Sequence, residues 1–515
     1  MSQRSRIALP GVGLTIAALA LTACGGGSVG GGGGQAEGTV TTVINGDPSG
    51  FNPFMYRTTN DAILETFLYD TLLRMDDGNT LVPALASEWK AKSASSYTFT
   101  IRNGATCADG TPITAEVVAN SLSVLADPKT AAAARSLIFG AGDATISADG
   151  DTVSIELNKP YSELPRGMSM AQSGIVCPAG LEDQDALNTS PVEGAYSGPY
   201  VLKKTEPGVG YELALREDYD QWPEYETDLP GEPPRTVNVT VSADPSTVAN
   251  RLTSGDLDFG VITNDNVERF EDDSDFNIKQ AFTYWVFVVF NQREGSPFHD
   301  NLALRTAVAQ AISRQSFSNA TTDGRAPLLS GIGTEDSECV LSDESLLVPT
   351  DTDAAKQKLS GVDLKMIGYT SLPGAVAIQE ALNAVGANVD LNTTDTAGWA
   401  TAVTQQTVDW DLTVMGGNPP LLQSLTRIMG TPAEDGGRSI SGVRLPDAEK
   451  ALDAGLAADT PEAKCAAFQD AQRAVLKDVA AVPLVALPDN VIIRDGVDVQ
   501  VLNGEVDYKT IRITG

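Results

Sequence analysis

The chain has 515 residues, which is too long for a single compact core and indicates two or three domains. Its 35 basic residues face 68 acidic ones, so the net charge is −33 and a nucleic-acid partner, which requires basic patches, is excluded. A hydrophobic fraction of 42% and a charged fraction of 20% are ordinary for a globular protein, so we interpret the acidity as a solvated surface.

The first residues have the order of an export signal. Arg4 and Arg6 precede an apolar stretch that is too short and too broken by glycine to span a membrane. The word LTAC, which ends at Cys24, resembles a bacterial lipobox and implies that residues 1–23 are cleaved and that Cys24 carries a lipid. An ordinary signal peptide with an incidental cysteine is the alternative. Residues 24–38 are rich in glycine and predict a flexible tether, so we expect a lipid-anchored protein on the extracytoplasmic face of the cell membrane.

Four further cysteines predict two disulfides, because an even number in an exported chain is typical of a disulfide framework. Three pairings are open, and we expect one bridge within each half of the chain, Cys107–Cys177 and Cys339–Cys465. Four buried free thiols are the alternative. No pair of these cysteines has the sequence spacing of zinc ligands.

Short strands and helices alternate in the first half of the chain. Strands are predicted where apolar and polar side chains alternate, and a helix is predicted where apolar residues follow Thr114, a plausible N-cap. The predicted strands are 96–102, 151–157, 236–244 and 257–262, and the predicted helices are 114–125 and 245–255. The last three elements of this half, strand, helix and strand, have the spacing of a βαβ unit.

The pattern changes at residues 281–291, the most apolar and aromatic run of the mature chain, which predict a strand buried on both faces. Behind it helices and strands alternate again, and we expect a compact α/β domain with mostly parallel strands. The predicted helices are 301–314, 374–386, 396–408 and 461–480, and the predicted strands are 362–369, 387–395, 409–417 and 481–487. Residues 491–502 then indicate a return to the first domain.

Several stretches carry specific words as well as patterns. In chain order they are ALASEWKAKSASSYTFTIRNGATCADGTPITAEVVANSL (84–122), SGPYVL (197–202), RLTSGDLDFGVI (251–262) and FNQREGSPFHDNLALRTAVAQAISRQSF (290–317). Together they resemble the signature regions of the family 5 solute-binding proteins of ABC transporters, which include the dipeptide and oligopeptide binders. The resemblance spans residues 40–511.

This resemblance implies an α/β fold of the periplasmic-binding-protein type II class, in which two lobes joined by two hinge segments close on a ligand. Lobe one is expected at residues 39–283 and 490–515, with an inserted subdomain at about 76–190, and lobe two at 284–489. The resemblance also implies a monomer that captures peptides or peptide-like solutes and delivers them to separate permease and ATPase subunits.

Eight residues are candidates for contacts with the ligand. The segment 49–62 resembles the part that opens lobe one in dipeptide binders, and a tryptophan on the helix predicted at 396–408 matches one that flanks the ligand of oligopeptide binders. Of two adjacent aromatic residues at the crossing between the lobes, one should face the cleft and the other the core. The candidates are Tyr56, Thr58, Thr59, Tyr284, Trp285, Trp399, Gly417 and Asn418. The alternatives are an exposed loop for the first three and a place in the core for Trp399.

The loop at residues 416–420 departs from the peptide binders of the family. Those proteins place an aspartate there, which pairs with the α-ammonium group of the peptide more strongly than a neutral residue can. Here the loop reads GGNPP, and the next acid is Glu434. A non-peptide solute, such as a glycan or a siderophore-like compound, is therefore the alternative ligand, and a sensor or structural lipoprotein is the alternative role.

His299 is the single histidine of the chain, and its position argues against an enzyme. It occupies a variable position in the family's P-F-x-D word, where a solvated loop residue is expected. Neither a G-x-S-x-G elbow nor a G-K-[ST] phosphate loop occurs in the sequence, and one imidazole cannot form a multidentate metal site. We therefore expect no catalytic residue, no cofactor and no metal.

Overall fold

The structure is a computed structural model that describes residues 38–515 apart from 264, 371, 373 and 418–419. The predicted signal peptide, Cys24 and nearly all of the predicted tether lie outside the described residues, and so does Asn418. In the part that is described, no helix combines the length and the apolar character needed to cross a membrane.

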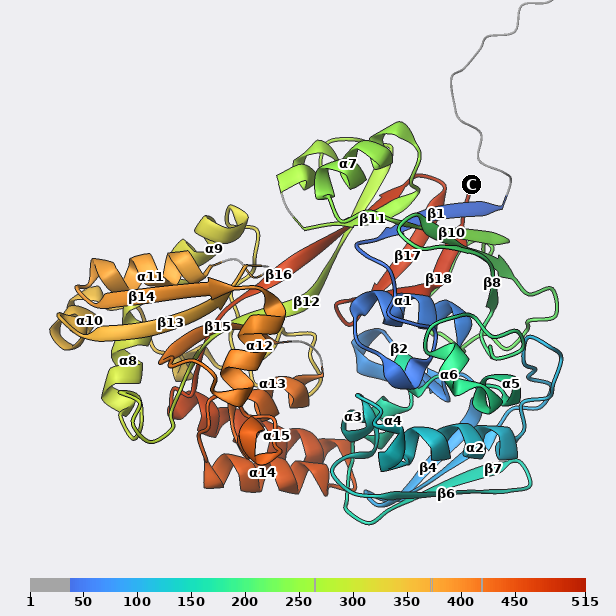
Figure 1. Cartoon of the computed structure of the whole chain (residues 1–515), viewed down its shortest axis with the longest axis horizontal. Coiled ribbons are helices and arrows are strands. Elements are labelled where there is room, and N and C mark those ends of the chain that lie inside the picture. The colour runs from blue at the N-terminus through green and yellow to red at the C-terminus, as the bar shows by residue number, and fades with distance from the viewer. Residues whose placement is uncertain (1–37, 264, 371, 373, 418–419) are drawn as a thin grey trace, which may run out of the picture. The chain divides into compact units, whose positions relative to one another are not determined.

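The first sheet has the strand order β1-β10-β9-β8 (Figure 1). Its first two strands are parallel and the others antiparallel. A hairpin of the last two strands of the chain lies beside it, and helix α1 packs against both β8 and β18. The bounds are β1 Thr39–Ile44, α1 Thr59–Leu68, β8 Tyr200–Glu206, β9 Gly210–Leu215, β10 Thr236–Val241, β17 Val497–Leu502 and β18 Glu505–Ile513.

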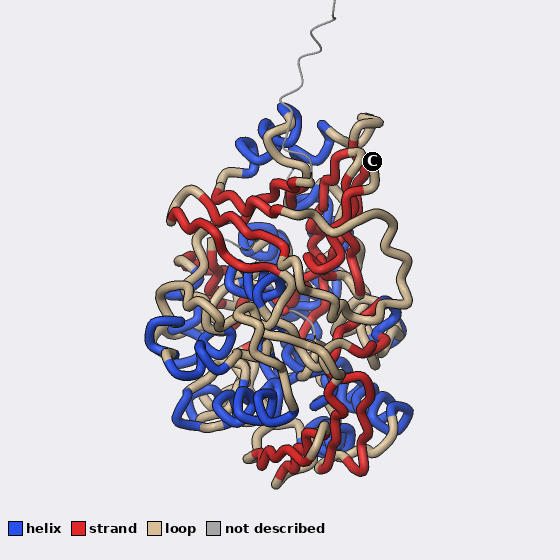
Figure 2. The backbone as a smooth tube through the Cα atoms, turned by 90° about the vertical axis from the view of Figure 1, so that its right-hand side faces the viewer, coloured by secondary structure: helices blue, strands red, loops and turns tan. Residues whose placement is uncertain are grey.

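The second sheet is fully antiparallel, with the order β4-β5-β7-β6, and lies at the end opposite the C-terminus in both views (Figure 1, Figure 2). It confirms the strands predicted at 96–102 and 151–157 and the helix predicted at 114–125, which packs on it as α2. Thr114 caps this helix as expected, because its hydroxyl accepts a hydrogen bond from the amide of Val117. The bounds are β4 Ala86–Ser93, β5 Ser96–Ile101, α2 Ala115–Ala126, β6 Ala144–Asp149 and β7 Thr152–Leu157.

The third sheet has six strands in the order β11-β16-β12-β15-β13-β14. Two of them, β12 and β16, are long and run from the neighbourhood of β11 to that of β13 (Figure 1). Residues 285–290 of β12 are all buried, which confirms the strand predicted to be buried on both faces. The bounds are β11 Phe259–Ile262, β12 Phe276–Phe290, β13 Asp363–Tyr369, β14 Asn388–Thr394, β15 Leu412–Gly417 and β16 Ala481–Arg494.

The expectation of mostly parallel strands in the second half is wrong. The pairs β13–β14 and β13–β15 are parallel, whereas the pairs β11–β16, β16–β12 and β12–β15 are antiparallel. The reason is topological, because β12 enters this part of the molecule and β16 leaves it, so the two strands run in opposite directions. The predicted βαβ unit also fails, since β10 and β11 belong to different sheets.

Helices surround the six-stranded sheet and connect the other elements. The four helices predicted in the second half of the chain are present as α8, α11, α12 and α15, although α8 ends at Ala311, before the predicted end at 314. The helices α9, α10, α13 and α14 were not predicted. The remaining bounds are α3 Arg135–Phe139, α4 Leu164–Gly167, α5 Pro178–Glu182, α6 Gln184–Leu187, α7 Pro245–Ser254, α8 Leu302–Ala311, α9 Arg314–Thr322, α10 Thr352–Leu359, α11 Ala375–Ala384, α12 Thr396–Gln405, α13 Leu421–Ile428, α14 Pro446–Leu456, α15 Pro461–Lys477, and the hairpin strands β2 Leu73–Asp76 and β3 Thr80–Pro83.

The pairing of β12 with β16 is interrupted near its middle. Ala281 lies opposite Asp489, but the next paired residue, Tyr284, lies opposite Leu487, so the register shifts between the two positions. Such an irregularity bends a strand and weakens the ladder locally. The shift falls where the sequence predicts the chain to cross from one lobe to the other.

Two disulfides are present in the described residues, and their pairing is the predicted one. Cys107 is joined to Cys177 and Cys339 to Cys465, across 70 and 126 residues of sequence respectively. Each bridge stays within one half of the chain. Closing loops of this length lowers the entropy of the unfolded chain by an amount worth about 4–5 kcal/mol for each bridge.

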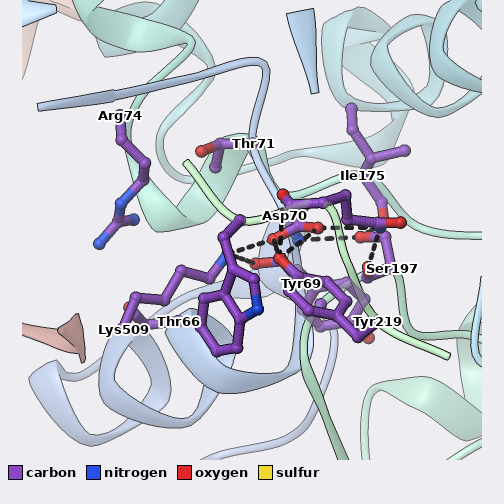
Figure 3. A network of polar contacts seen from close by, with 12 residues as sticks. Thr66, Tyr69, Asp70, Thr71, Arg74, Ile175, Ser197, Tyr219 and Lys509 are labelled. Carbon is purple, nitrogen blue, oxygen red and sulfur yellow. Dashed lines mark hydrogen bonds and ion pairs between the residues drawn. The ribbon is translucent and has the colours of Figure 1, made fainter. Parts of the chain in front are cut away.

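A buried ion pair ties the C-terminal strand to the end of α1. The ammonium group of Lys509 contacts the carboxylate of Asp70, and the two side chains are 1% and 2% exposed. The same ammonium donates a hydrogen bond to the carbonyl of Tyr69 at 2.9 Å. The hydroxyl of Tyr219 donates to both oxygens of Asp70 at 3.0 and 3.1 Å (Figure 3), and Gln221 donates to one of them at 3.0 Å. The Asp70 carboxylate is thus fully enclosed by donors.

Candidate ligand-binding site

A cavity of about 1150 Å³ lies between segments that are far apart in the sequence. Its volume is at the upper end of what small-molecule sites usually provide, so it can hold a solute of several functional groups. The wall includes residues of α1, the start of α13, the long strands β12 and β16, and the C-terminal hairpin. Each half of the chain therefore contributes to the wall.

The aromatic pair at the crossing has one exposed and one buried member, and both contribute to the cavity wall. Tyr284 is 37% exposed, whereas Trp285 is fully buried and its indole N–H donates to the carbonyl of Phe282 at 3.1 Å. Contact of either residue with a ligand stays a prediction. A side chain on Gly416 would collide with the Tyr284 ring, so this glycine permits the position of Tyr284. The phenol of Tyr284 is thus exposed in the cavity, and the buried indole of Trp285 anchors the strand beside it.

The segment predicted to open lobe one reaches the cavity with two of its three candidate residues. Tyr56 and Thr59 line the wall, and burial followed by nearby acids, Glu65 first, raises the pKa of Tyr56, so its hydroxyl stays protonated. Thr58 is the N-cap of α1 instead, with its hydroxyl accepting a hydrogen bond from Asp61 N and the Asp61 carboxylate bonding back to Thr58 N. Thr58 therefore positions the segment and does not line the cavity.

Trp399 is buried, with 4% of its surface exposed, and it does not line the cavity. Its indole N–H donates to the hydroxyl of Thr413 at 2.8 Å, and its ring packs against Tyr369 at a centroid distance of 4.6 Å. With its only polar group already bonded, Trp399 has the features of the alternative interpretation, a core residue. Contact with a ligand remains an untested prediction for this residue.

The glycines of the 416–420 loop also serve packing. A side chain on Gly417 would collide with Ser424 and Phe287, and its backbone pairs with Trp285. Gly417 does not line the cavity, and Asn418 lies outside the described residues. Glu434, the first acid after the loop, forms a bidentate ion pair with Arg293 at 2.5 and 2.7 Å and is therefore not available to a ligand.

The sequence did not predict the ion pairs that connect residues of the cavity wall. Arg166 pairs with Glu338 at 2.7 Å, and Lys464 pairs with both Glu338 at 2.6 Å and Glu163 at 2.8 Å. Glu338 and Lys464 are the sequence neighbours of Cys339 and Cys465, so the disulfide holds them side by side. The cluster Glu338, Cys339 and Cys465 has metal-binding elements, but its two sulfurs are in the bridge and cannot act as thiolate ligands.

Three carboxylates on the wall, those of Asp336, Asp489 and Glu505, form no ion pair with other described residues. Glu505 starts β18, and Asp489 lies in β16, where it accepts a hydrogen bond from the hydroxyl of Thr283 at 2.5 Å. Burial raises the pKa of these two carboxyl groups, in Glu505 against the attraction of Arg166 and Arg74. A ligand that donates hydrogen bonds or brings positive charge would compensate them.

Comparison with known sequences identifies the family. The model of the bacterial extracellular solute-binding proteins, family 5 Middle, matches residues 80–437, which is more than half of the chain. The chain belongs to this family. Among curated proteins, Protein XP55 of Streptomyces lividans is 27% identical over 87% of this chain and 83% of its own length. The probable D,D-dipeptide-binding periplasmic protein DdpA of Escherichia coli is 25% identical over 85% of this chain and 86% of its own length.

Solved structures of other substrate-binding proteins share the fold. A substrate-binding protein from Microbacterium hydrocarbonoxydans, complexed with 4-hydroxybenzoate hydrazide, is 39% identical with a TM-score of 0.78, over 93% of this chain and all of its own. A dipeptide-binding protein from a Pseudoalteromonas species, in complex with Met-Leu, is 18% identical with a TM-score of 0.75, over 92% of this chain and all of its own. The predicted two-lobed type II fold is therefore confirmed.

Proposed function

We propose that this chain is the extracytoplasmic solute-binding component of an ABC importer and that it captures peptides or peptide-like solutes in the cavity. The observation that carries the proposal is the 1150 Å³ cavity, whose wall combines aromatic side chains with uncompensated carboxylates from distant parts of a family 5 chain. In this role the solute-bound form delivers its cargo to separate permease and ATPase subunits, and the chain itself catalyses no reaction.

The lobes are proposed to divide as the sequence suggests, with lobe one at residues 39–283 and 490–515 and lobe two at 284–489. The register shift between β12 and β16 supports this division, because the pairing of the two strands is interrupted where both are expected to cross between the lobes. A ligand that contacts both lobes then favours the closed form by its differential affinity for it.

Attachment to the membrane is proposed to occur through a lipid on Cys24, after removal of residues 1–23. The motif LTAC and the glycine-rich tether behind it support this assignment. The intact mass of the mature protein tests it, since a wild-type chain should begin at Cys24 and carry the lipid mass. A Cys24→Ala chain should instead be found in the soluble fraction, and a membrane-bound Cys24→Ala chain would contradict the assignment.

The amine end of the ligand is proposed to meet Glu505 and Asp489. These carboxylates lie on the wall without ion-pair partners among the described residues, whereas the 416–420 loop brings no acid to the site. They can accept hydrogen bonds from an ammonium, amide or hydrazide group. The second candidate ligand is therefore a small aromatic acyl compound, which the bound 4-hydroxybenzoate hydrazide of the 39% identical Microbacterium protein favours.

A thermal-shift panel tests the function. The full chain is heated with free dipeptides, N-acetylated dipeptides and aromatic hydrazides, and a bound solute at one hundred times its Kd should stabilise the folded state by about 2.7 kcal/mol. Stabilisation by free dipeptides supports the peptide proposal. Stabilisation by hydrazides alone favours the second candidate, and no stabilisation by any solute would contradict the receptor role.

A further inference from the structure

Two arginines of the cavity wall, the exposed Arg57 and the half-buried Arg438, form no ion pair among the described residues. Arg438 lines the cavity, and its Nε atom is buried without a hydrogen-bond partner. The other buried arginines of the wall are compensated, since Arg74 pairs with Asp507 at 2.5 Å and Arg166 pairs with Glu338. The Arg438 side chain is half-buried, so a charge without a counter-ion at this place costs some stability.

A second arginine lies behind Arg438 and adds to the positive charge. Arg427, on α13, donates to the carbonyl of Gly416 at 3.2 Å and lies over the Trp399 ring at 5.8 Å. Neither Arg427 nor Arg438 forms an ion pair with an acidic side chain among the residues that the structure describes. Burial and then the nearby Arg427 lower the pKa of Arg438, as expected for two like charges brought together.

The loop that carries Arg438 is held firmly in place. The hydroxyl of Ser441 donates to the carbonyl of Ile428, and the amide of Ile440 donates to the carbonyl of Arg427 at 2.9 Å. Arg293 donates to the carbonyl of Ile440 at 2.7 Å and binds Glu434 of the same loop. One acid of the loop, Glu434, is thus engaged with Arg293, and the guanidinium of Arg438 is presented to the cavity by a preorganised backbone.

We propose that Arg438 is the anion subsite of the cavity and that it binds a carboxylate of the solute, with Arg427 strengthening the positive potential behind it. The planar guanidinium matches a carboxylate in geometry and in charge. The assignment rests on the proposed receptor function and adds a substrate class to it, namely solutes that end in a carboxylate. The carboxylate of such a solute would be the counter-ion that Arg438 lacks among the described residues.

Matched pairs of probes test the subsite on the full chain by isothermal titration calorimetry. The pairs are Met-Leu with Met-Leu amide, and 4-hydroxybenzoate with 4-hydroxybenzoate hydrazide, so that each pair differs at the carboxylate. The wild type should bind the acid of at least one pair more tightly than its neutral partner. Arg438→Gln should weaken binding of that acid about ten- to a hundredfold and leave the neutral partner within about threefold.

Two further variants separate the subsite from general effects. Arg438→Lys keeps the charge but loses the planar fork, so it should restore part of the affinity for the acid. The control is Arg235→Gln, because Arg235 is exposed, does not line the cavity and forms no ion pair among the described residues. Arg235→Gln should leave the preference for the acid unchanged.

The Tm of the ligand-free variants is measured alongside the titrations. Because Arg438 is repelled by Arg427 and has no counter-ion, Arg438→Gln should leave the Tm of the ligand-free protein unchanged or raise it. A lower Tm would identify Arg438 as a structural residue and overturn the proposal. So would an unchanged preference for the acid in Arg438→Gln, or a wild type that prefers the neutral probes while the receptor function stands. If no probe binds, the receptor function fails and the subsite fails with it.

Discussion

Removal of the Lys509 ammonium should strongly destabilise the protein. In Lys509→Met the carboxylate of Asp70 loses its ionic partner but stays buried, with the neutral donors Tyr219 and Gln221 as its remaining contacts. Both ionic side chains are 1–2% exposed, so water cannot replace the lost ammonium. Breaking one side of such a buried pair costs about 3–5 kcal/mol, which is a large part of the stability of a typical folded protein.

Urea unfolding at pH 7, with both disulfides intact, measures the loss as a change in the free energy of unfolding. The exposed pair Lys365–Asp409 provides a matched control, because its side chains are 55% and 76% exposed and Lys365→Met should cost less than about 1 kcal/mol. The double variant Asp70→Asn, Lys509→Met should recover more than half of the loss, since an amide oxygen still accepts from Tyr219. Equal losses in Lys509→Met and Lys365→Met would refute the reasoning.

Three further predictions concern other charged and titratable groups. Burial opposes ionisation of Glu338, but Arg166 and Lys464 outweigh it and keep the pKa of its carboxyl below the ordinary value. The ionised carboxylate therefore stabilises the fold above about pH 4.3, and this stabilisation is lost as the pH falls through the folded-state pKa. Glu338→Gln should cost about 1–2 kcal/mol in urea unfolding at pH 7 and little at pH 3, and equal costs at both pH values would contradict this. Burial, and then Asp61, raise the pKa of Glu65 well above the ordinary value, so the folded state holds a proton on this carboxyl and loses stability as the pH rises. Glu65→Gln should therefore stabilise the chain at pH 8 but not at pH 4, and a lower free energy of unfolding at pH 8 would argue against it. His299→Ala should leave the Kd of any solute found in the panel within about twofold by calorimetry, because the ring contacts the carbonyl of Gln292 and the carboxylate of Asp300 and does not line the cavity. A tenfold loss of affinity would overturn its neutral role.

Local features of the fold could be predicted where a short stretch of sequence determines the structure. Thr114 caps α2 because a hydroxyl at that position satisfies a free amide, whatever the rest of the fold does. Residues 285–290 are buried because a continuous apolar run requires cover on both faces. The disulfide pairing also followed from a simple rule, one bridge within each half of the chain.

Features that depend on distant partners could not be predicted. The direction of the strands next to β12 follows from the return of β16, which lies about 200 residues later in the sequence. The word SGPY resembled a family motif, but its physical role emerges only in the fold, where the hydroxyl of Ser197 bonds to Asp70 N and Gly198 packs against the backbone at the end of α1.

The candidate site shows the same division between local and distant information. Tyr284 and Trp285 were assigned to opposite sides because adjacent residues of a strand point to opposite faces. Trp399 resembled a ligand contact by position, yet its indole bonds to Thr413 of a neighbouring strand. Arg438 could not be singled out in the sequence, because only the folded structure shows that no acidic side chain pairs with it among the described residues.

The central claim, that a solute binds in the cavity, is tested most directly by filling that space. Ala62 of α1 lines the cavity, whereas Val376 of α11 is 56% exposed on the surface, so Ala62→Trp and Val376→Trp introduce the same side chain inside and outside the site. Calorimetric titration of each full-length variant with a solute that stabilises the wild type is the decisive measurement. We predict that Val376→Trp binds like the wild type and that Ala62→Trp loses binding, and unchanged binding by a folded Ala62→Trp chain would contradict the account.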